Sequence, residues 1–264
     1  MITIHHRETG ARLLEVAGDT LAGAHLDGAI LLYADLRDAD LRGADLRGAD
    51  LCQADLRGAC FDGARLAGAD ITLANLAGAS FRDARMADAR LQAVSLGEPG
   101  PARTNFQGAD LTRVTLKNSN LAESVFTDAE MRRIDLTHVN LRGAHLSGAN
   151  LTEANLSYSD LRGADFGFAM LLSALFNGAD LREAVLRQAD LTFATHNDVR
   201  LGGADLTGAR LSRTVFARIR DLSQVRGLEA VEYLHPSSID VESLRQGGEG
   251  LSTAFLAAFG LESP

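Results

Sequence analysis

The residues that could do chemistry are mainly aspartates and arginines, and they recur at a fixed spacing. Asp35, Asp40, Asp45 and Asp55 are each followed two positions later by Arg. Carboxylates on neighbouring strands stand about 4.8 Å apart, close to the separation of the two carboxylates in a retaining glycosidase. Each of these carboxylates, however, has a basic residue beside it, which is typical of a solvated, ion-paired surface. We expect no catalytic residue among them.

Other reactive groups lack the partners that a site would need. His5 and His6 are adjacent, but no Cys or carboxylate cluster completes a metal site beside them. Cys52 and Cys60 fall on different outward positions, so we expect no disulfide and a reducing, cytoplasmic location. No phosphate-binding Gly loop, nucleophile elbow, zinc or kinase signature is present. We therefore predict a protein that is not an enzyme and that uses no cofactor and no metal.

A period of five residues determines the elements that carry these side chains. From Leu21 to Phe216 a large apolar residue is due at every fifth position, and 38 of the 40 positions hold Leu, Phe, Ile or Met. Pro101 and His196 are the exceptions, and Ala stands two residues before the apolar one in 28 cases. A helix would scatter such a repeat around its cylinder, and a long strand needs alternation of two. We expect each pentapeptide to form one short side of a coil, with coils stacked through parallel backbone hydrogen bonds.

This pattern resembles that of pentapeptide-repeat proteins over about three quarters of the chain. The resemblance implies an all-β fold, a right-handed quadrilateral parallel β-helix with about ten coils. Phe61 and Phe81 are four pentapeptides apart, as are Phe106 and Phe126, which favours four sides per coil and stacked aromatic side chains.

Three parts are expected along the chain. Residues 1–20 form an N-terminal β-hairpin cap, with strands at Ile2–His6 and Arg12–Val16 and a turn at Gly10. Residues 21–218 form the pentapeptide-repeat β-helix, and residues 219–264 form a C-terminal helical tail. The hairpin is expected to cover the open edge of the first coil, because an uncapped edge invites association.

The tail carries two helix signals. Ser238 is a candidate N-cap for a helix at Ile239–Arg245, and Ser252 for a second at Thr253–Phe259, which Gly260 would end. The apolar face of the second helix consists of Leu251, Phe255, Leu256 and Phe259. We expect this face to cap the last coil, to form a homodimer, or both.

Two segments interrupt the repeat without changing its phase. Residues 97–101 contain two prolines, yet Phe106 arrives on schedule. We therefore expect this segment to replace one side of one coil as an exposed bulge and to insert nothing. His196 stands at an interior-type position, so it is either a hydrogen-bonded core histidine or has its ring turned outward, and we expect the second.

Apolar residues at outward positions predict a contact surface. Phe168, Met170, Leu172 and Phe193 map to one corner and its adjoining side, and Leu32, Tyr33 and Leu73 map to the other end of that side. We interpret the first group as a candidate partner surface. The alternative is that it packs against the chain's own C-terminal tail.

The net charge of −9 is spread thinly. With four sides, two balance and two carry a net charge of −2, with Asp45 and Asp165 on one acidic side. No side is basic and no apolar run approaches the length of a membrane span, so we expect neither direct nucleic-acid binding nor a membrane partner.

The resemblance also implies a protein partner. Family members that resemble a DNA duplex in width and acidity bind type II topoisomerases such as gyrase and protect them from quinolones or natural poisons. This chain differs from them in having no phase-breaking loop inserted between coils, nearly balanced sides and a longer tail. Two hypotheses follow: a DNA-mimicking protector of DNA gyrase or topoisomerase IV, or a scaffold or regulatory adaptor that binds another cytoplasmic protein through the Phe168 corner.

Overall fold

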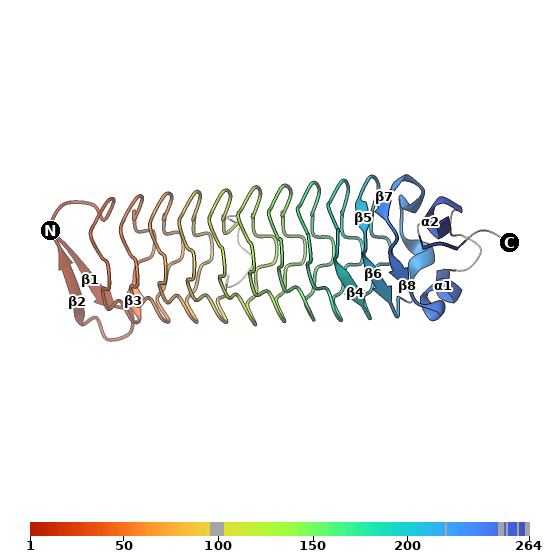
Figure 1. Cartoon of the computed structure of the whole chain (residues 1–264). Helices are drawn as coiled ribbons and strands as arrows, with labels where there is room; N and C mark the ends of the chain where they lie inside the picture. The colour runs from red at the N-terminus through yellow and green to blue at the C-terminus, as the bar shows by residue number, and fades with distance from the viewer. Residues whose placement is uncertain (96–102, 220, 248–250, 252, 258, 262–264) are drawn as a thin grey trace.

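A stack of parallel coils makes up most of the protein (Figure 1). The computed structural model describes residues 1–95, 103–219, 221–247, 251, 253–257 and 259–261. Residues at the same place in neighbouring coils pair with one another, as His25, Asp45 and Arg65 do in succession. Four pentapeptides therefore complete one coil, as the repeat predicted.

Longer regular elements lie mainly at the two ends of the stack. They are the strands β1 (Ile2–His6), β2 (Arg12–Val16), β3 (Ala34–Asp35), β4 (Thr195–Asn197), β5 (Arg210–Ser212), β6 (Val215–Ala217), β7 (Glu232–His235) and β8 (Ser238–Ile239), the 3₁₀ helices η1 (Leu222–Gln224) and η2 (Leu228–Ala230), and the α-helices α1 (Val241–Gly247) and α2 (Thr253–Ala257).

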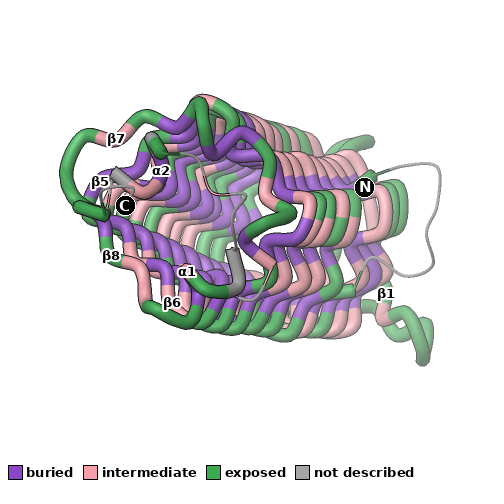
Figure 2. Tube along the Cα trace, turned by 90° about the vertical axis from the view of Figure 1, so that its right-hand side faces the viewer, coloured by how far each residue is buried: buried purple, intermediate pink, exposed green. Residues whose placement is uncertain are grey.

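Each pentapeptide turns a corner and puts two side chains inside. The side chains of Ala44 and Leu46 are fully buried, and Asp45 between them donates its N–H to the preceding coil at 2.9 Å. Leu46 donates its N–H to the next coil at 2.7 Å. The corner residue, Gly48, has a φ of 64°, where glycine costs least. Along the stack, buried residues line the inside of the coils and exposed ones their corners (Figure 2).

The prediction that residues 97–101 insert nothing is wrong. Cys60 pairs with Ser80, four pentapeptides further along the chain, and Asn105 pairs with Val125 at the same interval. Ser80, however, pairs with Asn105, which is five pentapeptides further along. One pentapeptide is therefore added between two coils, and because it matches the period exactly in length the repeat conceals it. The expected bulge itself lies outside the described residues.

Four phenylalanines form one continuous ladder inside the coils. Phe61 stacks on Phe81 with ring centroids 4.8 Å apart, and Phe106 stacks on Phe126 at 4.9 Å, as predicted. The ladder also crosses the added pentapeptide, because Phe81 stacks on Phe106 at 5.0 Å. Phenylalanine therefore still stacks on phenylalanine where the pentapeptide is added.

The prediction that His196 turns outward is wrong. Its side chain is 1% exposed and lies between the rings of Phe176 and Phe216, with centroids 4.9 Å away on both sides. A neutral imidazole is a flat ring that can take the place of phenylalanine in a stack. Burial lowers the pKa of His196 to about 4, so the ring is neutral at physiological pH.

The two N-terminal strands expected from the sequence are β1 and β2, which pair antiparallel. β1 also pairs antiparallel with β3, through His5 with Asp35 and His6 with Ala34. The hairpin thereby joins one side of the first coils. Ile4 of β1 is buried in the core.

The helix expected at Ile239–Arg245 is α1, which begins two residues later, at Val241, and follows the two 3₁₀ helices and the strands β7 and β8. Ser238 is not an N-cap, because it lies in β8 and pairs with Val215 of β6. The N-cap of α1 is Asp240, whose carboxylate accepts hydrogen bonds from the N–H of Ser243 at 2.9 Å and from its hydroxyl at 2.8 Å. Parallel β pairing thus continues from β6 to Ser238 and Ile239, the two residues at which a helix start was expected. Ser252 lies outside the described residues.

The Asp-x-Arg pairs form the ion-paired surface that the sequence predicted. Arg57, for example, donates two hydrogen bonds to Asp55, at 2.8 and 2.6 Å, and Arg182 holds Asp180 in the same way. In the described part of the chain, no helix has the length and apolar character needed to cross a membrane.

Candidate functional site: a partner-binding surface

The last residue of each pentapeptide lies at a corner of the coil. The backbone there is left-handed, with φ of 58° at Phe168 and 60° at Phe193. This conformation costs an L-residue other than glycine about 1 kcal/mol or more, and asparagine less than most. A bulky side chain at a corner is therefore held there at some cost to stability.

Phe168, Met170, Leu172 and Phe193 form one surface, which we call the apolar patch. Phe168 is 65% exposed, Met170 41% and Phe193 48%, and Leu172 is half-buried. The first three residues of the patch lie on one side of one coil, and Phe193 is at the far corner of the next coil, because Ser173 donates its N–H to Thr192. The sequence assigned these four to one place, and the structure brings them together.

The second predicted group lies elsewhere. Leu73 and Tyr33 belong to a different corner, because the added pentapeptide displaces every later one by one side. Tyr33 stacks on His6 at 5.1 Å, with the guanidinium of Arg7 over its ring, so it serves the N-terminal hairpin. The expectation that Leu32, Tyr33 and Leu73 extend the Phe168 surface is wrong.

The expected acidic side is wrong for the same reason. Asp45 pairs with His25 and Arg65, whereas Asp165 pairs with His145 and Val185 on an adjacent side. The charge balance predicted for each of the four sides rests on the same register and fails with it.

Asp45 is also held in ion pairs. It accepts two hydrogen bonds from Arg47, at 2.7 and 2.6 Å, and one from Arg65 at 2.8 Å. The bonds from Arg47 lower the pKa of Asp45 to about 2. Asp45 therefore offers no free charge to a partner.

Asp165 has a different environment. It is half-buried and accepts a hydrogen bond from the N–H of Gly167 at 2.9 Å. No cation lies within ion-pair distance of it in the described part of the chain, and the same holds for three other carboxylates of this side, Asp62, Asp83 and Asp128.

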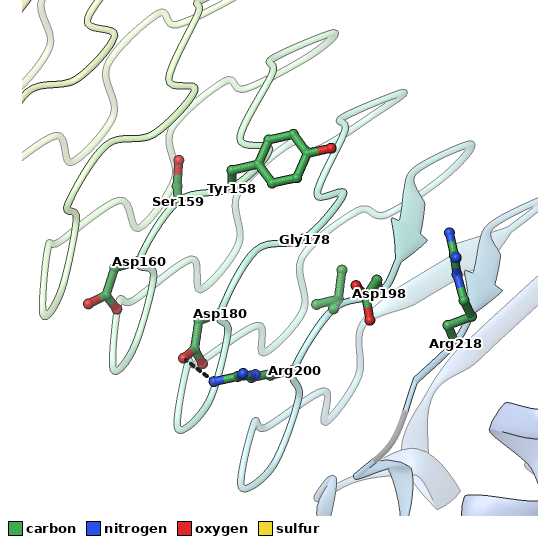
Figure 3. A pocket seen from close by; sticks show the side chains of 9 residues that line it. Tyr158, Ser159, Asp160, Gly178, Asp180, Asp198, Arg200 and Arg218 are labelled. Atoms are coloured by element: carbon green, nitrogen blue, oxygen red, sulfur yellow. Dashed lines mark ion pairs between the residues drawn. The ribbon is translucent and has the colours of Figure 1, made fainter.

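A groove of about 510 Å³ opens along another side, near the C-terminal end of the stack. In Figure 3 the ring of Tyr158 extends over the next coil towards Gly178, with Asp180 and Arg200 below it. A Cβ at Gly178 would stand 2.7 Å from the Tyr158 ring, so this glycine leaves room for the aromatic side chain. The repeat pattern alone does not indicate this groove, although a Tyr at one corner and a Gly four pentapeptides later are a signal for it.

The carboxylates of the groove are unsuited to proton transfer. Hydrogen bonds from Arg162 lower the pKa of Asp160. Burial raises the pKa of Asp180, but the bonds from Arg182 outweigh it and the net direction is down. Both carboxylates are therefore ionised at neutral pH, whereas a glycosidase needs one carboxyl whose pKa is raised.

One group in the described residues could approach a metal-binding arrangement. His25, Asp27 and Asp45 bring one ligand atom each within 4.8 Å of one another. Since Asp45 already accepts bonds from Arg47 and Arg65, a cation there would have to displace two guanidinium groups. This arrangement does not favour a metal.

The apolar face predicted for the tail packs onto the end of the stack. Phe255 is fully buried, with Tyr233 at 6.4 Å, and Phe259 meets Phe216 edge-on at 6.1 Å. Leu251 and Leu256 are half-buried against the same core.

Comparison with known proteins agrees with the repeat. The family model for pentapeptide repeats matches eight copies, over residues 21–58, 59–97, 104–143, 129–167 and 173–195. No curated protein matches the chain.

Two solved structures illustrate the likeness. HetL, a pentapeptide repeat protein involved in heterocyst differentiation regulation from the cyanobacterium Nostoc sp. strain PCC 7120, is 29% identical over 77% of this chain and 89% of its own, with a TM-score of 0.31. QnrB1, a plasmid-mediated fluoroquinolone resistance protein, is 18% identical over 78% of this chain and 96% of its own, with a TM-score of 0.42.

Proposed function

Because the chain belongs to the pentapeptide-repeat family, we propose that it is a non-enzymatic binding protein that presents the apolar patch to another protein. In this proposal the chain is a right-handed, four-sided rod of about ten coils. Such a rod is stiff and offers a flat, preformed surface, so little conformational entropy is lost on binding.

The observation that carries the proposal is the position of Phe168 and Phe193. Both rings are held at left-handed corners, at a cost of about 1 kcal/mol each, and remain largely in water. Tyr33 and Tyr158 occupy similar corners, but their rings stack on His6 and on His138. No ring stacks on Phe168 or Phe193 in the described residues, and Phe193 has the guanidinium of Arg213 over its ring, 5.6 Å from the centroid.

Packing against the C-terminal tail, the alternative, finds no support in the described residues. The tail places Phe255 and Phe259 on the end of the stack, and Phe168 stays 65% exposed. The patch is therefore available to a partner.

A pull-down with matched variants tests the proposal. In one variant, Phe168 and Phe193 become Asn, which tolerates a left-handed backbone. The control is Leu73→Asn, at a corner with φ of 62° and 54% exposure. We expect the control to retain the proteins that wild type binds and the double variant to lose at least one. Equal binding by all three proteins would refute the proposal.

Protection of DNA gyrase or topoisomerase IV is the second candidate function. A pentapeptide is added between two coils, but it keeps the phase of the repeat, so the lack of a phase-breaking loop remains a difference from the protective members of the family. Asp62, Asp83, Asp128 and Asp165, which have no ion-pair partner in the described residues, give one side a modest acidic character suited to a basic DNA-binding groove.

Supercoiling and cleavage-complex assays with a quinolone test this candidate. Protection should weaken steeply as salt rises, since exposed charges are screened beyond about 8 Å at 0.15 M. Asp165→Lys should reduce protection more than the control, Asp110→Lys. Asp110 also has no ion-pair partner in the described residues and, like Asp165, accepts a hydrogen bond from the N–H of the residue two positions later. If micromolar protein neither inhibits nor protects, this candidate is excluded and the adaptor function remains.

A further inference from the structure

We propose that the apolar patch binds an extended segment of its partner that carries an acidic residue on each side of its apolar residues. This inference rests on the proposed function, because it names the chemistry of the segment that the same surface would hold.

Two arginines bracket the patch and form no ion pair in the described residues. They are Arg132 and Arg213, and both are exposed. Arg133, by contrast, is bound to Glu153 at 2.7 Å, and Arg210 to Asp190 at 3.3 Å. The positive charge available near the patch is therefore concentrated at two points.

These two points lie in neighbouring rows along the same edge of the stack. Arg132 occupies the position of Leu172 two coils earlier, because Arg113, Arg133 and Glu153 donate successively to residues 132, 152 and 172. Arg213 follows Phe193 at the same corner one coil later, because Phe193 donates its N–H to Ser212. Leu172 and Phe193 thus lie between the two arginines.

The separation of the arginines fixes the length of the segment. Four coils at about 4.8 Å each separate Arg132 from Arg213, or about 19 Å along the stack. An extended chain rises about 3.3 Å per residue, so about six residues would separate the two acidic side chains. Apolar residues between them would meet Leu172 and Phe193.

Arg213 is already oriented for such a contact. Its guanidinium lies over the ring of Phe193, 5.6 Å from the centroid. Stacking uses the face of the guanidinium and leaves its N–H edge available for a carboxylate. A bound acidic residue would then contact the arginine while its apolar neighbour covers the ring.

Strand addition is excluded as the binding mode on this side. Met170 accepts from Leu151 and donates to Ala149, and Leu171 donates to Asp190, so the backbone is already paired with both neighbouring coils. Recognition must come from side chains. The affinity of such a short segment is expected to be on the order of micromolar.

Two acidic groups near the patch, Glu130 and Asp165, lie on its other edge, whereas Glu153 lies at the Phe193 corner two coils earlier and is bound to Arg133 at 2.7 Å. Glu130 shares the position of Met170 two coils earlier and accepts a hydrogen bond from Asn150 at 2.9 Å. Asp165 lies across the corner formed by Phe168. The segment is therefore expected to run along the Phe193 edge, away from Glu130 and Asp165 and past Glu153, whose charge Arg133 balances.

Peptide selection on the full-length protein tests the inference. A display library of random twelve-residue peptides would be selected on wild type and on the Arg132→Glu/Arg213→Glu variant. We expect wild type to enrich two acidic residues, five to seven positions apart, around large apolar ones. The variant should enrich basic residues at those positions and bind the wild-type peptides at least tenfold more weakly. Arg142→Glu, which changes an exposed arginine without an ion-pair partner in the described residues on another side, is the control.

The outcomes separate the two proposals. Selected peptides that need Phe168 and Phe193 but bind the charge variant unchanged would overturn the inference and leave the proposed function standing. Peptides that bind the Phe168→Asn/Phe193→Asn variant as well as wild type would count against the proposed function itself. Failure to enrich any peptide would overturn the inference.

Discussion

Phe168 and His196 are both aromatic residues where the repeat usually places another type, and the surroundings explain only one of them. His196 lies between two phenylalanine rings that bury both its faces. Phe168 stands in water at a left-handed corner and gains no comparable contact. At the residue scale, therefore, the burial of the ring distinguishes a core residue, His196, from a candidate binding residue, Phe168.

His196 should make stability depend on pH. In the described residues its Nδ1 has no hydrogen-bond partner, and burial lowers its pKa to about 4. Because the unfolded chain takes up a proton near pH 6.5, this contribution to stability is complete above that pH and is lost as pH falls towards 4. Between pH 7.5 and 5.0 the loss is about 2 kcal/mol.

His196→Phe should remove this dependence and continue the aromatic ladder. Urea unfolding of wild type and variant at both pH values measures it. The same pH dependence in both proteins would show that His196 does not titrate as the buried ring predicts.

At the scale of elements, the stack of coils continues across an added pentapeptide. Ser80 pairs directly with Asn105, so the ladder of backbone hydrogen bonds closes across the addition. The chain would keep both its period of five and its coil of four pentapeptides if the addition were removed.

Deletion of residues 97–101 should leave the protein folded. Leu96 would then be followed by Ala102, and residues 102–106 would continue the repeat without interruption. A shorter connection costs less entropy on folding, so the melting temperature should be unchanged or slightly raised. A broad, non-cooperative transition would mean that the deleted segment forms part of a coil.

The C-terminal helices should stabilise the end of the stack. Removing residues 251–264 would expose Phe216 and remove the buried Phe255, at a cost of about 3 kcal/mol or more. Val241→Ser, a change at a position 63% exposed, is the near-neutral control. Thermal unfolding gives the stability, and sedimentation measures whether the tail also forms a dimer. Unchanged melting and unchanged mass would show that the tail is an unattached appendage.

At the scale of the whole molecule, each coil contacts mainly its neighbours, and stability is a sum of local terms. Amide hydrogen exchange should therefore be slowest in the middle of the stack, around Leu146, and faster towards Leu21 and Leu211. Truncation of the tail should extend fast exchange inward from the C-terminal end only. Uniform protection along the chain would contradict this expectation.

The sequence predicts the coil well because its period is strict, but it leaves the alignment of distant coils undetermined. Leu stands at nearly every interior position, so the four sides have similar sequences. The addition of one whole pentapeptide therefore leaves the spacing of the apolar residues unchanged. The placement of Asp45, Asp165 and Leu73 failed for this reason. Phe81 and Phe106 are five pentapeptides apart, between two intervals of four, and this was the signal that could have revealed the addition.

The candidate surface was predictable where it depended on neighbouring residues alone. Phe168, Met170 and Leu172 lie within one pentapeptide and its edge, so no error of alignment could separate them. Arg132 and Arg213 were missed because their significance is the lack of an ion pair, which depends on the geometry of side chains several coils apart.

The phenylalanine ladder also bears on how the chain avoids folding in a wrong alignment. A coil slipped by one pentapeptide would bury nearly the same leucines and form all but one of the same backbone bonds, since Pro101 at an interior position has no N–H to donate to the next coil. With four pentapeptides in every coil and no addition, Phe81 would face Pro101 instead of Phe106. Each lost ring stack costs about 1 kcal/mol. Replacing the four phenylalanines by leucine would therefore cost little burial but remove one of the features that favour the observed alignment.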